Sequence, residues 1–465
     1  MTRNCWRCLS VPRAGIGSRK RTQRGERTRR SSSAAAADAD TRSGTGYPSF
    51  SSRKLAGSVG RGLVARNAAA LAGSRVLGGA AGFLLLALAG RRLSLGDFGL
   101  FYWLAAVTGV LVVASDFGLD QLLVKEASIE PGALRGLARR AVGLKLAISV
   151  TLGLASYAVL SSARSPASTE PVAVALMLGS LPLLGMAHTA WFCADPSERM
   201  HLRAAQAVAF EFLRFAAAAA VLVLGLGVLG LCGAWFGAAV VAAVIGAVVL
   251  KRLGLTLAPS MPEASLLKRV LPFACFQLES VGLINVPTAV LGWVKGKEQV
   301  GLFSYGALFL LGVWMLAAAT SDALFPRLSR GQVRPVRIVL ATLGFSVVLV
   351  GVLTPFRGTL VGVVFGEPRP VTEVVLLFLL PAGAFASVQP LASKALMASG
   401  RTMALAVFEG FVLLGLGLTC WAAARADGAV AVAKMVLIWR AVEAAGLIAL
   451  IVGIASVRNM RNHIA

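Results

Sequence analysis

The stretch GLFYWLAAVTGVLVVASD, residues 99–116, carries one charged side chain, and that charge stands at its last position, Asp116. A helix needs about 20 mostly apolar residues to cross the ~30 Å hydrocarbon layer of a membrane, so this stretch and its flanks predict a transmembrane helix. A similar opening, GLFSY, recurs at 301–305 before a second apolar run, which ends in TSD (320–322) where the first ends in ASD (114–116). This recurrence predicts a chain built from two equivalent halves.

Apolar runs of the same kind extend outward from both copies of the repeat. We expect helices near 68–90, 98–119, 141–162, 171–194, 203–225 and 229–250, then near 270–293, 302–325, 336–356, 371–397, 403–424 and 430–456. The sequence therefore predicts an all-α polytopic membrane protein with about twelve transmembrane helices in two six-helix lobes. Six is an even number, so both lobes insert in the same orientation, and a pseudo-two-fold axis runs along the membrane normal.

The polar segments set the expected domain boundaries. Residues 1–62 are rich in Arg, Ser, Ala and Gly, include RKRTQRGERTRR (19–30), and predict a disordered basic tail. This tail loosely resembles an organelle transit peptide, but we favour an over-extended start site, because the family-like pattern begins only near Val64. The N-terminal lobe is expected at 63–250, an inter-lobe linker at 251–269, and the C-terminal lobe with a short cytoplasmic tail at 270–465.

The composition excludes a soluble protein. Hydrophobic residues make up 57% of the chain and charged residues 14%, against roughly 25% charged residues in soluble domains. The formal net charge of +25 suggests nucleic acid at first sight. However, residues 1–66 hold 15 Lys and Arg against three acids, and the remaining basic residues fall mostly in loops between apolar runs. That distribution is typical of cytoplasmic loops, and we predict no nucleic-acid partner.

The loop charges also predict the orientation. Eighteen basic residues fall in the even-numbered connections and the C-terminal tail, against eight in the odd-numbered connections. By the positive-inside rule, both termini are expected in the cytoplasm of a multi-pass protein of the plasma (inner) membrane. No loop on the outside exceeds about 15 residues, which leaves no room for a catalytic domain there. We therefore predict that the chain is not an enzyme.

Metal and cofactor sites are not expected. Cys5 and Cys8 form one C-x2-C pair, but a structural zinc site needs two further ligands, and His188 and His201 belong to a distant part of the chain. No nucleotide-binding motif is present either.

Several longer stretches resemble a known family. They are GRRLSLGDFGLFYWLAAVTGVLVVASDFGLDQLLVKEAS (90–128), KGKEQVGLFSYGALFLLGVWMLAAATSDALFPRLSR (295–330), VVFGEP (363–368) and ALMASGR (395–401). The chain resembles the lipid-linked oligosaccharide flippases of the multidrug/oligosaccharidyl-lipid/polysaccharide exporter superfamily. The resemblance implies alternating-access transport of an isoprenoid-diphosphate-linked oligosaccharide from the cytoplasmic to the outer leaflet, for lipopolysaccharide or exopolysaccharide synthesis. It also implies membrane lipids and the pathway's glycosyltransferases or polymerase as partners.

Other transporters of this superfamily remain alternatives. A multidrug exporter usually needs acidic sites for organic cations, and a peptidoglycan-precursor flippase generally has helices beyond twelve. A membrane glycosyltransferase or polymerase is an alternative from another class, and it requires a large outside loop that this sequence lacks.

Three arginines within the apolar spans are candidate substrate-binding residues, because charges deep in a membrane are costly and mark functional sites. They are Arg75, Arg214 and Arg440, and a guanidinium pairs bidentately with phosphate oxygens. Arg75 has no acid within four residues and is the strongest candidate. Glu211 and Glu443 stand three residues from Arg214 and Arg440, so a local ion pair is the alternative in both cases.

Helix 270–293 contains the candidate gate. Glu279 lies mid-span, and Asn285 and Pro287 follow it. Proline removes a backbone hydrogen bond and loosens a helix, which makes this segment a candidate gating or ion-coupling element. The alternative is a protonated Glu279 that is hydrogen-bonded to a neighbouring helix.

Two further patterns favour structural roles. Lys145 stands near a predicted helix end, where its long side chain is expected to reach the interface. The spacings Gly78-x-x-x-Gly82 and Gly233-x-x-x-Gly237 predict close helix packing.

Overall fold

A computed structural model describes residues 59–162, 165–195, 200–255, 264–329, 335–367, 369–399 and 401–464. Within these ranges all regular structure is helical. The α-helices are α1 (Val59–Arg92), α2 (Leu95–Asp116), α3 (Leu119–Ile129), α4 (Leu134–Leu160), α5 (Pro171–Phe192), α6 (Met200–Val223), α7 (Gly227–Arg252), α8 (Ala264–Lys295), α9 (Lys297–Ser329), α10 (Pro335–Leu353), α11 (Arg357–Phe365), α12 (Pro370–Ala386), α13 (Val388–Ala398) and α14 (Thr402–Ile464). Short 3-10 turns cover Pro131–Ala133 and Thr354–Phe356.

The number of membrane spans agrees with the sequence prediction. Ten helical segments of the described chain are long and apolar enough to cross a membrane. One of them, in α14, holds two spans, because Asp427 and Gly428 have non-helical backbone angles and split the helix. The 32-residue α8 is also long enough to cross a membrane, and it is counted here because part of it lies outside the residues searched for spans. Ten plus these two gives twelve spans, and the prediction of about twelve is confirmed.

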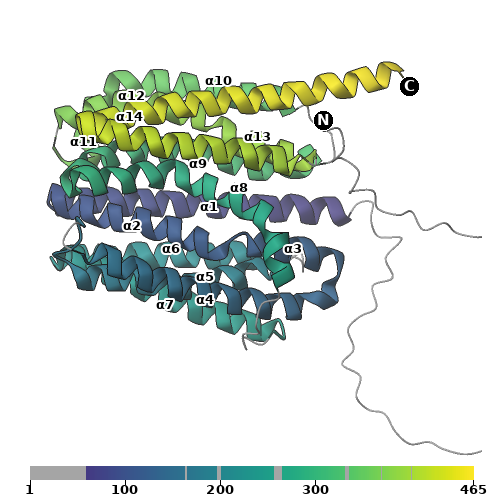
Figure 1. The fold of residues 1–465 in the computed structure, drawn as a ribbon, viewed down its shortest axis with the longest axis horizontal. Helices are drawn as coiled ribbons and strands as arrows, with labels where there is room; N and C mark the ends of the chain where they lie inside the picture. The colour runs from purple at the N-terminus through teal and green to yellow at the C-terminus, as the bar shows by residue number, and fades with distance from the viewer. Residues whose placement is uncertain are drawn as a thin grey trace, which may run out of the picture. The chain divides into compact units, whose positions relative to one another are not determined.

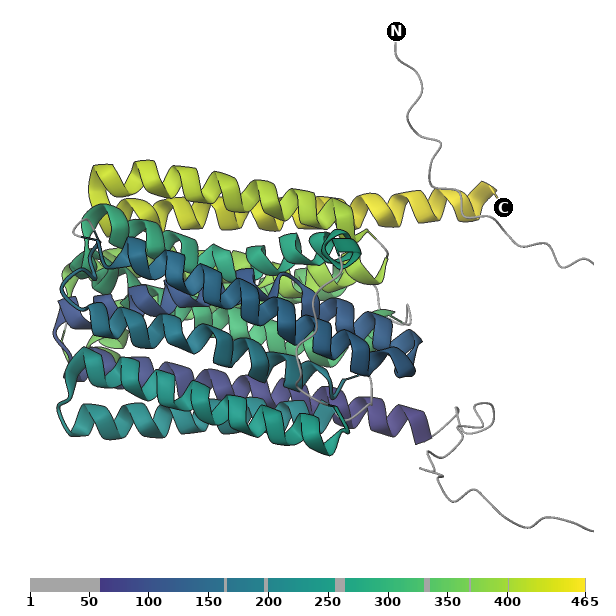
Figure 2. The same ribbon diagram turned by 60° about the horizontal axis from the view of Figure 1, so that its bottom comes forward.

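The helices lie side by side in two groups (Figure 1). In the first half of the chain, α5 packs on α7 and α4, and α1 packs on α6. In the second half, α8 packs on α14, and α12 packs on α9 and α14. The two lobes meet where α1 and α2 pack against α8 and α9. In the turned view of Figure 2, the helices still run roughly along one common direction.

The start and end of α2 follow from local sequence. The Ser94 hydroxyl caps the helix by accepting a hydrogen bond from the Asp97 backbone N–H at 3.1 Å. The helix ends where Phe117 and Gly118 adopt left-handed backbone angles, with φ of 49° and 78°. The chain then continues as α3, so the two helices together form one long span.

Two helices repeat a proline pattern that accompanies the lobe repeat. Helix α5 begins at Pro171 and contains Pro182, and α12 begins at Pro370 and contains Pro381. The prolines stand eleven positions apart in both helices. A proline is tolerated at the first helical position, whereas one in the interior removes a backbone hydrogen bond. The equivalent helices of the two lobes therefore lack a backbone hydrogen-bond donor at the same place.

Aromatic side chains fill the contact between the lobes near the start of α2 and α9. The rings of Phe98 and Tyr305 stack with centroids 4.7 Å apart. The Tyr305 hydroxyl donates a hydrogen bond to the Gly90 carbonyl at 3.1 Å. These residues are buried or nearly so, and they join α1, α2 and α9 at one end of the bundle.

Some element boundaries differ from those expected. Helix α1 begins at Val59, so the last residues of the predicted tail are helical, while 1–58 lie outside the described residues. Helix α4 begins at Leu134 rather than near 141. The prediction started too late because Arg135, Arg139 and Arg140 make the first two turns too polar to count as part of an apolar span. The predicted linker 251–269 overlaps the end of α7 and the start of α8.

Candidate functional site

A cavity of about 870 Å³ lies between the lobes. Its walls come from α1, α5 and α6 of the N-terminal lobe and from α9 and α10 of the C-terminal lobe. Most lining side chains are apolar, and four ionisable ones converge among them: Arg75, His188, Glu211 and Arg214. Two of the three arginines predicted to bind substrate therefore share one cavity.

Arg214 lies between an acidic side chain, an aromatic ring and two glycines of α1. Its guanidinium lies 2.5 Å from the Glu211 carboxylate and 4.7 Å from the ring centroid of Trp235. On α1, a Cβ added to Gly78 would lie 3.1 Å from Glu211, and one added to Gly82 would lie 3.5 Å from Arg214. The glycine pair of α1 thus makes room for the ion pair of α6, and the prediction of close packing is confirmed for Gly78 and Gly82.

Arg75 lies on α1 with its side chain exposed to the cavity. The positive charges of Arg75 and of Arg203, on α6, repel each other, and both repel the ammonium group of Lys394 on α13. Arg203 also forms an ion pair with Asp195 at 2.5 Å. Basic groups from both lobes therefore gather on the Arg75 side of the cavity.

Asp195 lies in the connection between α5 and α6, outside the spans. Burial raises the pKa of its carboxyl group, while the nearby charge of Arg203 acts in the opposite direction. The ion pair therefore holds together a partly desolvated connection next to the cavity.

An apolar groove of about 400 Å³ adjoins the cavity. It runs between α9 and α10 and shares Val313, Leu316 and Leu349 with the cavity wall. Phe345 of α10 lines this groove with 63% of its surface exposed. The site as a whole thus combines a charged chamber with an adjoining apolar groove.

Arg440 does not line this cavity. Its guanidinium lies 2.8 Å from the Glu443 carboxylate, and both side chains are almost completely buried in the C-terminal lobe. This is the local ion pair that the sequence left open as the alternative. A role for Arg440 in substrate binding stays a prediction, without a place in the cavity to support it.

The candidate gate residues lie along α8. Glu279 belongs to the helix, and its side chain lies outside the described residues. Asn285 faces the other lobe, where a Cβ on Gly109 of α2 would lie 2.8 Å from its side-chain nitrogen. Pro287 is buried, and α8 continues as helix through it. Gating by this segment stays a prediction.

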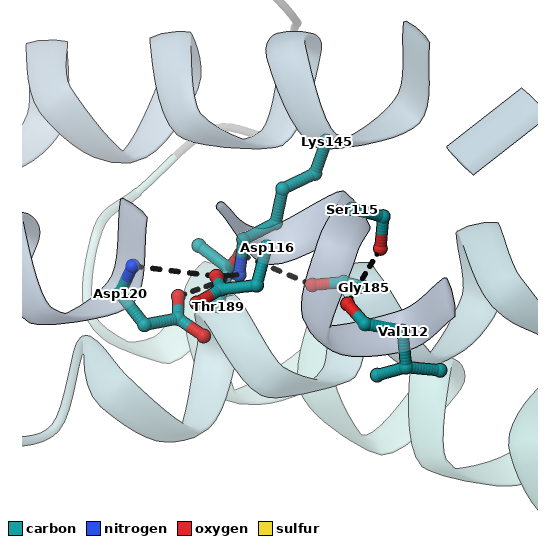
Figure 3. A network of polar contacts seen from close by, with 7 residues as sticks. All are labelled: Val112, Ser115, Asp116, Asp120, Lys145, Gly185 and Thr189. Carbon is teal, nitrogen blue, oxygen red and sulfur yellow. Dashed lines mark hydrogen bonds and ion pairs between the residues drawn. The ribbon is translucent and has the colours of Figure 1, made fainter. Parts of the chain in front are cut away.

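A buried network of charges joins α2, α3 and α4 (Figure 3). The Lys145 ammonium lies 2.6 Å from a carboxylate oxygen of Asp116 and 2.6 Å from one of Asp120. Only 1% of its side chain is exposed, so the prediction that Lys145 reaches the interface is wrong. The reason is that two carboxylates at the α2–α3 turn offer it buried partners, and it points toward them.

Sequence reasoning missed several residues around the site. His188 of α5 lines the cavity and lies close enough to Asp116 and Lys145 for their charges to act on it. Trp191, one helical turn further along, lines the same wall. A histidine and a tryptophan three residues apart inside an apolar span were the available signal.

Other sequence-level candidates have different outcomes. A Cβ added to Gly233 or Gly237 would meet no atom within 4 Å, so the close packing predicted for this pair is wrong within the chain. The described residues hold no group of three or more His, Cys, Asp and Glu side chains placed to bind a metal ion. Cys5 and Cys8 lie outside the described residues.

Two six-helix lobes around a central cavity define the fold of a polytopic membrane transporter. A family model described as polysaccharide biosynthesis protein matches residues 64–332, which is more than half of the chain. The chain belongs to this family of polysaccharide biosynthesis proteins, and the family resemblance seen in the sequence is confirmed. A comparison with curated protein sequences finds no match.

Solved structures of transporters share the fold. A multidrug resistance MATE family transporter of the MOP superfamily in its outward-facing conformation has a TM-score of 0.62 at 14% identity, over 85% of this chain and 96% of that one. The inward-facing conformation of such a transporter gives 0.61 at 17% identity, over 82% and 95%. A MOP superfamily transporter from Pyrococcus furiosus, described as having a binding pocket of reverse polarity, gives 0.60 at 14% identity, over 84% and 96%.

Proposed function

We propose that this protein moves an isoprenoid-diphosphate-linked oligosaccharide from the cytoplasmic to the outer leaflet of the cell membrane, for the synthesis of a cell-surface polysaccharide such as lipopolysaccharide or exopolysaccharide. The observation that carries the proposal is the cavity between the lobes, which holds Arg75 and Arg214. Guanidinium groups pair with phosphate oxygens through two parallel hydrogen bonds, which suits a diphosphate.

The charge of the site favours an anionic ligand. Arg214 is paired with Glu211 and Arg203 with Asp195, and Arg75 and Lys394 bring further positive charge from α1 and α13. A diphosphate that entered the cavity would relieve the mutual repulsion of these cations. A hydrated chamber would also replace the water contacts that a sugar headgroup loses in lipid.

The groove between α9 and α10 supports a lipid-linked substrate. Its lining is mostly apolar, and it meets the charged cavity at Val313, Leu316 and Leu349. An isoprenoid chain could lie along this groove while its diphosphate reached the arginines. A water-soluble anion has no apolar chain that would occupy the groove.

Transport would then proceed by rocking of the two lobes, as expected for a repeat of this kind. The aromatic contact between Phe98 and Tyr305 joins the starts of α2 and α9, and these helix starts lie at the end of the bundle opposite the C-terminus. With both termini in the cytoplasm, this contact closes the outer side, and the cavity takes its substrate from the cytoplasmic leaflet. Separation at Phe98 and Tyr305 would open it outward.

A multidrug exporter is the second candidate, because the solved structures with this fold include multidrug transporters and the cavity wall is largely apolar. An organic cation would need a free acid in the cavity. Glu211 is the acid there, and its carboxylate is occupied by Arg214 at 2.5 Å. The flippase proposal therefore accounts for more of the cavity.

The test is transport of a fluorescent polyisoprenyl-diphosphate oligosaccharide in proteoliposomes. Wild-type protein is compared with Arg75→Ala and Arg214→Ala, and an organic cation is assayed in parallel. We expect the wild type to move the lipid, and we expect both variants to fold normally while moving it more than tenfold more slowly, from the loss of a charged hydrogen bond. Transport of the cation without the lipid, unaffected by either substitution, would favour the multidrug exporter.

A further inference from the structure

A second hollow lies at the end of the bundle opposite the C-terminus. It measures about 440 Å³ and is lined by Trp293, Val294 and Lys295 at the end of α8 and by Trp421 and Arg425 in the first half of α14. None of these residues lines the central cavity. The hollow is therefore separate from the proposed substrate site.

Two turns are fixed side by side next to this hollow. The side-chain oxygen of Gln299, in the first turn of α9, accepts a hydrogen bond from the Ala429 backbone N–H at 3.1 Å. Between these groups, Gly428 has a φ of 59°, and a Cβ there would lie 2.6 Å from the Gln299 oxygen. The α8–α9 turn is thus tied to the break in α14, which brings Lys295 and Arg425 to one place.

Tryptophan rings form the walls of the hollow. Trp293 and Trp421 are 43% and 45% exposed, although large aromatic side chains usually bury most of their surface. Trp293 lies against Trp103, with ring centroids 6.5 Å apart, and the Trp103 indole N–H donates to the Ala289 carbonyl at 2.9 Å. Trp293 thus packs on Trp103 and also lines the hollow.

Two cations, Lys295 and Arg425, stand beside the tryptophan rings. The Arg425 guanidinium lies 3.6 Å over the centroid of the Trp421 ring, a stacking that fixes its plane and leaves its N–H edges available. Among the residues that the structure describes, neither Lys295 nor Arg425 forms an ion pair with an acid. Two positive charges therefore remain to attract a negatively charged group.

An apolar stripe leads along α14 to this pair of charges. Phe411, Leu414, Leu418 and Trp421 follow one another at helical spacing, and the first three are 62%, 71% and 70% exposed. Residues three and four apart share a helix face, so the stripe is continuous. On a membrane span, such a face lies against lipid chains, and Trp, Lys and Arg at its end lie at the depth of the headgroups.

We propose that the hollow formed by Trp293, Lys295, Trp421 and Arg425 binds the headgroup phosphate of an anionic phospholipid, whose acyl chain lies along the Phe411–Trp421 stripe. The two cations bind the phosphate oxygens, and the tryptophans cover the glycerol region. Each basic group near a membrane surface attracts anionic lipid, so two of them that form no ion pair with a described acid favour it over a zwitterionic lipid. The occupant comes from the bilayer rather than from the transport path, because the hollow shares no wall with the central cavity.

The test uses the full-length protein in nanodiscs that contain phosphatidylcholine with or without phosphatidylglycerol, and retained lipid is measured by native mass spectrometry. We expect the wild type to retain phosphatidylglycerol over phosphatidylcholine by about tenfold or more, and the Lys295→Gln/Arg425→Gln double variant to lose this preference. The matched control is Lys251→Gln/Arg252→Gln, which removes two exposed basic residues at the end of α7, away from the hollow. The control is expected to behave as wild type.

Three results would overturn the proposal. One is equal retention of the two lipids by the wild type, and another is an undiminished preference in the Lys295→Gln/Arg425→Gln variant. The third is displacement of phosphatidylglycerol from wild-type protein by a polyisoprenyl diphosphate added as competitor, which would assign the hollow to the transported lipid. Because binding is measured directly, these outcomes do not depend on whether the protein transports an oligosaccharide.

Discussion

Gly99 and Gly301, the equivalent glycines of the sequence repeat, pack reciprocally at the contact between the lobes. A Cβ on Gly99 would lie 1.8 Å from the Lys297 carbonyl oxygen and 2.8 Å from the Gly301 nitrogen. A Cβ on Gly301 would lie 2.6 Å from the Leu95 carbonyl oxygen. Each glycine thus admits the backbone at the start of the other helix, as a two-fold axis between α2 and α9 requires.

Replacing Gly99 by alanine is expected to destabilise the protein, because the atoms in the way belong to backbone and cannot turn aside. Overpacking of this kind costs about 1–3 kcal/mol. We expect a lower midpoint of thermal unfolding in detergent for Gly99→Ala. The matched control is Gly233→Ala in α7, where an added Cβ meets no atom within 4 Å. It is expected to be neutral or slightly stabilising through helix propensity, and equal midpoints for both variants would refute the packing argument.

Arg214 and Arg440 allow a direct comparison of a cavity arginine with a core arginine. Both pair with a glutamate three residues away, at 2.5 Å and 2.8 Å. Arg214→Ala is expected to weaken binding of a polyisoprenyl diphosphate by about tenfold to a hundredfold, the contribution of a charged hydrogen bond, with little loss of stability. Fluorescence titration of purified protein with a labelled lipid diphosphate measures this.

Arg440→Ala is expected to act on stability instead. It leaves the buried Glu443 without its partner guanidinium, and breaking a buried ion pair costs about 3–5 kcal/mol. The measurement is the unfolding midpoint, with lipid-diphosphate binding titrated in the fraction that remains folded. Weakened binding in folded Arg440→Ala protein, at a stability equal to wild type, would instead return Arg440 to the substrate site.

Pairs of residues with the same spacing in the sequence have different surroundings in the structure, which shows what spacing alone can predict. The pairs Glu211/Arg214 and Arg440/Glu443 look equivalent, since spacing identifies a shared helix face but does not say what that face meets. The glycine pairs of α1 and α7 have the same spacing, yet only Gly78 and Gly82 have close neighbours.

The spans and the two-lobe repeat were predictable because hydrophobic length and the GLFYW/GLFSY recurrence are local features of the sequence. The partners of Lys145 were not, since they depend on how the α2–α3 turn packs against α4. The repeated prolines of α5 and α12 are local, however, and were available as a second signal for the lobe equivalence.

Lys145 is expected to be essential for the N-terminal lobe. Lys145→Met would leave Asp116 and Asp120 buried together without the ammonium between them, at a cost of about 3–5 kcal/mol. Adding Asp116→Asn and Asp120→Asn to the same chain removes the uncompensated charges, so the triple variant is expected to be more stable than the single one. Denaturant unfolding of the three proteins tests this order, and a triple variant less stable than Lys145→Met would show that the charges themselves are not the cause.

If the isoprenoid chain lies in the groove between α9 and α10, a substitution in this groove should impair lipid transport without impairing binding of the diphosphate headgroup. Ala341→Trp places a large ring in the groove, so we expect transport of the lipid-linked oligosaccharide to fall about tenfold or more, as for a blocked apolar pocket. Binding of a soluble, chain-free oligosaccharide diphosphate should be unchanged, because Arg75 and Arg214 lie in the neighbouring cavity. The matched control is Val348→Trp on the same helix, at a residue that is 67% exposed and does not line the groove. If both tryptophan variants transported the lipid at the wild-type rate, the chain would have to cross elsewhere, whereas loss of headgroup binding in Ala341→Trp alone would mean that cavity and groove form a single site.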